Sequence, residues 1–148
     1  MRFFLSISKP MYLIMEVSMN ALNQNRFNLV VGMVERGKQL GRTIGFPTAN
    51  LNLVAGFTIE NGVYGVYVYH NTKKYLGILN VGYRPTFKDG QHKTYEVHIL
   101  DFAEYIYDEY LTIEICLEIR NEKKFKNLQD LISQLQADEL FTRKNLIK

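Results

Sequence analysis

The stretch Leu111-Thr-Ile-Glu-Ile-Cys-Leu-Glu-Ile119 alternates apolar and polar residues without a break. In an extended chain successive side chains point to opposite faces, so the apolar positions of this stretch share one face. A regular period of two predicts a half-buried β-strand. We therefore expect one face of this segment to pack against a core and the other face to meet solvent.

Other segments also have strand character, because they are rich in Val, Ile and Tyr or alternate in the same way. These segments are 27–34, 48–53, 63–70, 74–82 and 94–100. The pair Asn71-Thr72 predicts a tight turn that joins two of them into a hairpin. Residues 83–93 predict a loop, because they contain Pro85, Asp89 and Gly90.

One helix is expected at the C-terminal end of the chain. Asn127 is a suitable N-cap, and the carboxylate of Asp130 is favourable near the positive end of a helix. Apolar residues then recur at helical spacing, at Leu128, Leu131, Ile132, Leu135, Leu140 and Phe141. About six strands followed by one helix argue against alternating β-α units. They favour a mainly β fold, an antiparallel sheet closed into a small barrel with the helix packed outside.

Composition limits the class of protein. A chain of 148 residues with 47% hydrophobic residues is long enough for one domain with a proper core. The net charge is only +3 and both signs are spread along the chain, which does not predict a nucleic-acid footprint. The lone Cys116 excludes an intrachain disulfide and a multi-cysteine zinc site. A reducing cytoplasm is the natural compartment.

The N-terminal residues are apolar in patches. Lys9 and Pro10 interrupt them, so no run approaches the roughly 18 residues that span a membrane. The segment is also a weak signal peptide, because it has no small-residue cleavage site. We interpret residues 1–25 as a variable extension or the remnant of a linker, and residues 26–148 as the domain.

A glycine-rich, basic segment follows the first expected strand. Its glycines let the backbone turn sharply and approach a ligand, and its cations suit phosphate. The glycines are Gly37, Gly41 and Gly45, and the cations are Arg36, Lys38 and Arg42. The spacing matches neither the Walker motif nor the dinucleotide fingerprint, so an ordinary solvated loop is the alternative.

The next residues predict a metal site. Pro47 fixes its own φ and favours an extended conformation for Phe46, which would hold the following residues rigidly. Thr48 and Asn50 are two apart, so on a strand they face the same side. A hydroxyl and an amide carbonyl are hard oxygen donors that suit Mg²⁺ better than a soft metal. The sequence thus predicts a phosphate loop followed by a magnesium site.

Four blocks of the chain resemble, in order and spacing, the riboflavin kinase family, which also forms the C-terminal half of bacterial bifunctional riboflavin kinase/FAD synthetases. The resemblance spans about residues 27–146. The blocks are Gly41-Arg-Thr-Ile-Gly-Phe-Pro-Thr-Ala-Asn50, Gly77-Ile-Leu-Asn-Val-Gly-Tyr-Arg-Pro-Thr-Phe87, Tyr95-Glu-Val-His-Ile-Leu-Asp-Phe102 and Leu117-Glu-Ile-Arg-Asn-Glu-Lys-Lys-Phe125.

The resemblance implies a six-stranded Greek-key barrel and a defined reaction. That reaction is the Mg²⁺-dependent transfer of the γ-phosphoryl group of ATP to the ribityl 5′-hydroxyl of riboflavin, which gives FMN and ADP. The expected partners are therefore riboflavin/FMN and ATP/ADP, with no nucleic acid and no membrane. We expect a cytoplasmic monomer, with any FAD synthetase activity on a separate protein.

The resemblance also assigns the catalytic base and the metal ligands. On the strand over residues 94–100, Glu96 and His98 share one face. The family places a catalytic base at Glu96, and the alternative is a solvated strand carboxylate. Thr48 and Asn50 match the Mg²⁺ ligands. His98 is expected to be a hydrogen-bond partner of Glu96 rather than a metal ligand.

The remaining site residues follow from the same resemblance. The ATP-binding positions are Gly37, Gly41 and Arg42, with Lys38 as a second candidate cation, and Ile99, Asp101 and Tyr107 near the adenosine. Tyr107 fits a packing role equally well. The flavin-binding positions are Arg120, Lys123 and Phe125, whose alternative is a polar strand-to-helix loop. Asn121 stands where the family usually has proline, which loosens this segment.

Two other functions compete with the kinase. The first is a non-catalytic flavin-binding or sensing barrel, because a fold alone does not define an activity. The presence of Glu96, Thr48 and Asn50 together favours the enzyme. The second is an oligonucleotide-binding barrel, which the modest net charge and the lack of a basic stripe disfavour.

Overall fold

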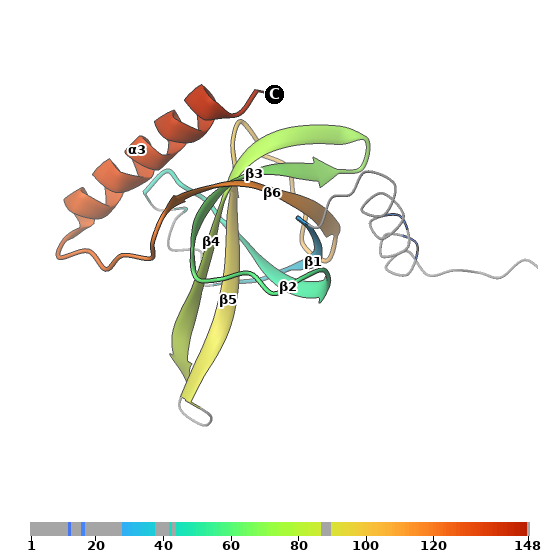
Figure 1. Ribbon diagram of the computed structural model, residues 1–148, viewed down its shortest axis with the longest axis horizontal. Coiled ribbons are helices and arrows are strands. Elements are labelled where there is room, and N and C mark those ends of the chain that lie inside the picture. The colour runs from blue at the N-terminus through green and yellow to red at the C-terminus, as the bar shows by residue number, and fades with distance from the viewer. Residues whose placement is uncertain are drawn as a thin grey trace, which may run out of the picture.

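The computed structural model describes residues 28–37, 44–86 and 90–147, together with Tyr12, Glu16 and Arg42. Six antiparallel strands close into a barrel, and a C-terminal helix lies outside it (Figure 1). The elements are β1 (Leu29–Glu35), β2 (Ala49–Ala55), β3 (Gly62–His70), β4 (Lys73–Thr86), β5 (Gly90–Ile99), β6 (Tyr110–Arg120) and α3 (Leu128–Asn145). The predicted extension over residues 1–25 lies outside the described residues except for Tyr12 and Glu16.

The strand order around the barrel is β1-β2-β5-β4-β3-β6, and β6 closes the barrel by pairing with β1. The β3-β4 and β4-β5 pairs are hairpins. Strands β5 and β4 lie between β2 and β3 in the sheet, so the connection from β2 to β3 passes two strands, and β2 pairs with β5. This is a Greek-key arrangement, and the predicted fold is confirmed.

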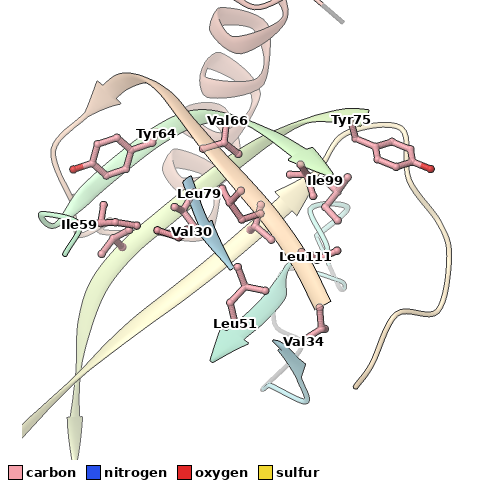
Figure 2. Close-up of a cluster of buried hydrophobic side chains, with 14 of the residues drawn as sticks. Val30, Val34, Leu51, Ile59, Tyr64, Val66, Tyr75, Leu79, Ile99 and Leu111 are labelled. Carbon is pink, nitrogen blue, oxygen red and sulfur yellow. The ribbon is translucent and has the colours of Figure 1, made fainter. Parts of the chain in front are cut away.

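The core fills the barrel interior with branched aliphatic side chains, as Figure 2 shows. Its buried members come from every strand, and those that are at most 1% exposed include Val30, Val66, Leu79, Val97 and Leu111. Burial of such residues is the main stabilising term of a small barrel. Side chains therefore fill the barrel interior.

The alternating stretch that predicted β6 does form a strand, but its apolar residues divide between two clusters. Ile113 and Ile115 face the barrel interior, whereas Leu117 and Ile119 pack in a second cluster that includes Leu146 after α3. The pairing with β3 shifts register where Gly65 and Val66 meet Leu117 and Ile115, which leaves Cys116 as an extra residue. A bulge of this kind turns the following side chains to the other face.

The predicted loop over residues 83–93 is wrong in most of its length. Strands β4 and β5 stay paired from Gly82 opposite Thr94 out to Thr86 opposite Gly90. Their ends project beyond the barrel as a two-stranded ribbon (Figure 1). A proline is tolerated in such a ribbon, because it has a free edge where no ladder hydrogen bond is needed.

Helix α3 begins where the sequence predicts, since the Asn127 side chain accepts a hydrogen bond from the Asp130 amide. Its contact with the barrel differs from the expected apolar stripe. The residues of α3 that become buried are Asp138 and Thr142, whereas Leu128 and Leu140 are exposed. Within the described residues, no helix is both long enough and apolar enough to cross a membrane.

Candidate active site

Glu96 lies on the outer face of β5 and is flanked by two asparagines. Its backbone pairs with Asn50 of β2 on one side and with Asn80 of β4 on the other. Directly opposed residues in a sheet point to the same face, so the three side chains form one polar row. The next residue, Val97, is fully buried in the interior, which confirms that Glu96 faces outward.

The carboxylate of Glu96 is held by an arginine that the sequence analysis did not single out. Arg84 Nη2 donates to Glu96 Oε1 at 3.0 Å, and the Glu96 side chain is 26% exposed. His98, the expected partner, instead bonds through Nδ1 to the Pro47 carbonyl oxygen at 2.7 Å and lies edge-on to Phe46. Arg84 belongs to the Arg-Pro-Thr part of a block already quoted, but only the paired strands reveal its reach to Glu96.

The predicted magnesium ligands lie at the start of β2, next to this row. Thr48 lines a cavity at the end of the barrel, and Asn50 is directly opposite Glu96. Gly37 packs onto the Asn50 side chain so closely that a Cβ atom there would lie 1.6 Å from Asn50 Nδ2. A Cβ atom at position 37 would therefore displace the Asn50 side chain from its present position.

The cavity has a volume of about 360 Å³. Its apolar base comes from the strands and its rim from residues 102–107, and of the predicted residues it includes Thr48, Arg42, Ile99 and Tyr107. The structure therefore brings these together from separate parts of the sequence. Gly41 and Lys38 lie outside the described residues.

The mouth of the cavity carries an aromatic and cationic contact. The Arg36 guanidinium lies 4.5 Å from the centroid of the Tyr107 ring, and its Nη2 donates to the Tyr105 hydroxyl at 2.9 Å. Tyr105 and Tyr107 meet edge to face with ring centroids 4.9 Å apart. A cation on an aromatic face adds a modest stabilisation, so these contacts tie the end of β1 to the rim.

Asp101 does not line this cavity. Its two carboxylate oxygens accept hydrogen bonds from Arg143 of α3, both at 2.8 Å. Hydrogen bonds to Asp101 and then to Glu139 raise the pKa of Arg143, so this guanidinium stays charged. The structure thus places Asp101 in a surface ion pair between the barrel and the helix.

Two of the three predicted flavin residues lie in the segment between β6 and α3, where a second depression of about 450 Å³ opens. Lys123 and Phe125 line it, and Lys123 Nζ lies 5.6 Å from the centre of the Phe125 ring. Glu122 of the same segment lies over Gly82 of β4, where a Cβ atom would be 2.2 Å from its Oε1. The segment therefore covers the same strand that presents Arg84.

Arg120 takes part in an ion pair instead of lining the depression. Its Nε and Nη2 donate to the Asp138 carboxylate at 3.1 and 2.9 Å. Asp138 is 1% exposed, and the pair joins the end of β6 to α3. The sequence analysis missed Asp138, because a polar residue on a helix is usually solvated and no motif marks it.

Two further properties limit the chemistry of the barrel. Within the described residues, no three or more His, Cys, Asp or Glu side chains are grouped so that they could hold a metal ion. Burial raises the pKa of Tyr95, the neighbour of Glu96 that faces the interior. Tyr95 is partly buried and packs against the core cluster.

Comparison with known proteins identifies the family of the chain. The sequence model of the riboflavin kinase (flavokinase) family matches residues 25–146. The chain is 40% identical over 111 residues to the RNA-binding riboflavin kinase RibR of Bacillus subtilis, and covers 47% of that protein from 74% of its own length. It is 44% identical over 113 residues to the bifunctional riboflavin kinase/FMN adenylyltransferase of Listeria monocytogenes, and this match covers 36% of that protein and 76% of this chain. The chain thus spans between about a third and a half of the length of these curated relatives.

Solved structures give the same result. A structure described as a macrolide-efflux protein from Streptococcus pneumoniae is 41% identical with a TM-score of 0.74, over 80% of this chain and 39% of that one. Riboflavin kinase from Trypanosoma brucei is 25% identical with a TM-score of 0.54, over 78% of this chain and 77% of that one. The fold and site define a riboflavin kinase-like β-barrel domain. The chain belongs to the riboflavin kinase family.

Proposed function

We propose that this chain phosphorylates riboflavin, with Mg²⁺-ATP as the phosphoryl donor, and releases FMN and ADP. The observation that carries the proposal is that the residues at the start of β2 connect the cavity to Glu96. Thr48 lines the cavity, and Asn50, two residues further on, is paired directly with Glu96. A nucleotide in the cavity would therefore place its terminal phosphate beside the carboxylate.

The reaction requires a base for the incoming hydroxyl. Glu96 takes the proton of the ribityl 5′-hydroxyl while that oxygen forms a bond to the γ-phosphorus, and the bond from the γ-phosphorus to the oxygen of ADP breaks. A positioned general base contributes about 10²- to 10⁴-fold. Arg84 orients the carboxylate through its 3.0 Å contact. Most of the remaining acceleration comes from alignment and charge neutralisation.

The donor set suits the expected metal ion. Thr48 and Asn50 offer a hydroxyl and an amide oxygen, and Mg²⁺ is usually held by a few protein oxygens with phosphates and water. The absence of a side chain at Gly37 leaves room for the Asn50 side chain in this position. Bound there, Mg²⁺ would neutralise charge on the phosphates. Arg42, at the cavity lining, supplies a cation for the same phosphates.

The flavin would lie on the side of the row formed by Asn50, Glu96 and Asn80 that is opposite the cavity. Phe125 offers an aromatic face to the isoalloxazine ring, and Lys123 offers donors. Both line the depression beside α3. Arg120 supports the site indirectly, because its ion pair with Asp138 fixes the segment that carries these residues.

The proposal extends to the organisation of the protein. We assign the kinase domain to residues 26–148, with residues 1–25 as an extension, and we infer a monomer that works in the cytoplasm. The family match over residues 25–146 supports the domain boundary. The lone Cys116 suits a reducing compartment.

A product assay tests the proposed reaction. The purified protein is incubated with riboflavin and ATP, with and without Mg²⁺, and the flavins are separated by chromatography. We expect FMN to form only with Mg²⁺, and FAD not to form. Riboflavin that binds without being phosphorylated would refute the kinase and support the sensing barrel.

A further inference from the structure

The segment 101–109, between β5 and β6, forms the rim of the cavity and is named here the cavity wall. It has no helix or strand, and it is bounded by two residues with left-handed backbone, Asp101 (φ 56°) and Asp108 (φ 64°). A segment without regular structure has few backbone hydrogen bonds to define its shape. Side chains must therefore hold the cavity wall in position.

One end of the cavity wall is attached to β1 by backbone hydrogen bonds. The Val34 amide donates to the Glu109 carbonyl oxygen at 2.8 Å, and the Asp108 amide donates to the Val34 carbonyl oxygen at 2.9 Å. Both bonds lie at the end nearest β6. They leave residues 102–107, which line the cavity, to be held by other contacts.

His70, at the end of β3, supplies contacts along the cavity wall. Its side chain is 6% exposed, and its Nε2 is 3.1 Å from Glu109 Oε1. Its Nδ1 is 3.8 Å from Glu104 Oε2. The ring also meets Phe102 edge to face, with centroids 6.1 Å apart. One buried side chain thus touches the wall near its start, in its middle and at its end.

The polar partners of His70 allow its imidazole to hold the cavity wall in place. Two carboxylates, on Glu104 and Glu109, face one imidazole from the cavity wall, and the Asn71 amide nitrogen lies 3.5 Å from Nε2 on the side of β3. A buried imidazole that loses its partners leaves a polar group unsatisfied, which is unfavourable. Tyr75 of β4 packs edge to face against Phe102 and supports the same ring.

We propose that His70 is a positioning residue for the nucleotide, which keeps the cavity wall in the shape that accepts the adenosine part of ATP. The inference rests on the proposed function, in that it takes ATP as the occupant of the cavity. His70 lies outside the cavity lining, so it acts through Phe102 and Glu104, which belong to that lining. Riboflavin would bind on the other side of Glu96, so its affinity should not depend on His70.

The test separates binding of ATP from binding of riboflavin. His70→Phe keeps an aromatic ring and removes both nitrogens, whereas His70→Gln keeps a donor for Glu109. We expect His70→Phe to raise KM and Kd for ATP about tenfold, which corresponds to about 1.4 kcal/mol, and His70→Gln to recover part of the loss. KM for riboflavin and kcat should stay near the wild-type values.

Two controls accompany these variants. Tyr69→Phe removes the neighbouring hydrogen bond on β3, from the Tyr69 hydroxyl to Glu114 Oε2, which is remote from the cavity wall, and it should behave as wild type. Ala103→Trp fills the cavity directly and should weaken ATP. If His70→Phe does not fold, Glu109→Ala removes the same contact from the other side and should show the same selective loss of ATP affinity.

The outcomes distinguish the inference from the proposed function. A loss confined to ATP supports this role of His70. Unchanged ATP affinity in the His70 variants, or equal losses for ATP, riboflavin and kcat, would overturn it. If Ala103→Trp weakens ATP but His70→Phe does not, the inference fails and the proposed function stands. If the wild-type protein binds ATP by calorimetry without forming FMN, the proposed function fails, and Kd for ATP still decides the role of His70.

Discussion

Replacing Asp138 with alanine removes the buried partner that attaches α3 to the barrel. The Asp138 carboxylate, 1% exposed, accepts hydrogen bonds from two guanidinium nitrogens of Arg120, Nε and Nη2, and from the Gln134 amide nitrogen at 2.9 Å. In Asp138→Ala the Arg120 charge, 18% exposed, stays beneath the helix without a counterion. The helix would have to lift, or the charge would stay buried alone.

The expected loss is large for a single side chain. Breaking a buried ion pair by removing one partner lowers the free energy of unfolding by about 3–5 kcal/mol. In a domain of this size each kcal/mol lowers Tm by about 2–4 °C, so Tm should fall by roughly 10 °C. An apolar pair at these positions, Arg120→Met with Asp138→Leu, should restore most of the loss, because replacing both members is often close to neutral.

The assay is urea unfolding together with thermal unfolding followed by circular dichroism. A matched control is Asp101→Asn, which neutralises the acidic partner of another Asp-Arg contact, to Arg143, where the aspartate side chain is 60% exposed. Asparagine also tolerates the left-handed backbone at position 101 (φ 56°), so the substitution adds no backbone strain. Surface pairs contribute about 0–1 kcal/mol, so the control should leave Tm almost unchanged. Equal effects of Asp138→Ala and Asp101→Asn would refute the claim that the Arg120 pair holds the helix.

Three further substitutions test the site. Gly37→Ala puts a Cβ atom 1.6 Å from Asn50 Nδ2, so the Asn50 side chain must swing away. We expect KM for Mg²⁺-ATP to rise at least about tenfold, and Tm to change little because only a flexible side chain moves. An unchanged KM would contradict the ligand role of Asn50. Thr48→Val removes the hydroxyl that we assign to Mg²⁺ and should raise the Mg²⁺ concentration required for half-maximal rate, which a Mg²⁺ titration measures; an unchanged titration would exclude Thr48 from the proposed metal site. Arg84→Met frees the Glu96 carboxylate from its 3.0 Å partner and should lower kcat about tenfold with KM for ATP preserved, whereas wild-type kcat would show that the contact is not needed to orient the base.

The alternating pattern over residues 111–119 predicted a strand but could not reveal the bulge. Periodicity identifies which residues alternate, and a single extra residue in the ladder depends on the facing strand. Gly65 and Val66 provide that information, because they pair with Leu117 and Ile115 and leave Cys116 between. The division of β6 between the barrel interior and the contact with α3 therefore became visible only in the structure.

The two other differences in the fold have a similar origin. Residues 83–93 contain turn-forming types, yet β4 and β5 continue because each strand provides a paired neighbour for the other. Helix α3 has apolar residues at helical spacing, yet Asp138 and Thr142 are its buried residues. Tertiary pairing overrode local propensity in both cases.

The sequence singled out candidate site residues where a residue's type and motif suggest a task. Glu96, Thr48 and Asn50 were chosen from the sequence, and the structure places Asn50 opposite Glu96, with Thr48 at the nearby cavity. Partners that depend on reach across strands or to the helix were not predictable. Arg84 was missed as the partner of Glu96, and the ion pair between Arg120 and Asp138 was not anticipated.

The role of Glu96 as the base of a riboflavin kinase is tested most directly by single-turnover formation of FMN. Wild-type protein and Glu96→Gln are mixed in excess over riboflavin with saturating Mg²⁺-ATP, and Glu118→Gln, an exposed glutamate of β6, serves as the control. We predict that Glu96→Gln lowers the rate by about 10²- to 10⁴-fold while riboflavin affinity and the control rate stay at the wild-type level. Formation of FMN by Glu96→Gln at the wild-type rate would contradict the assignment.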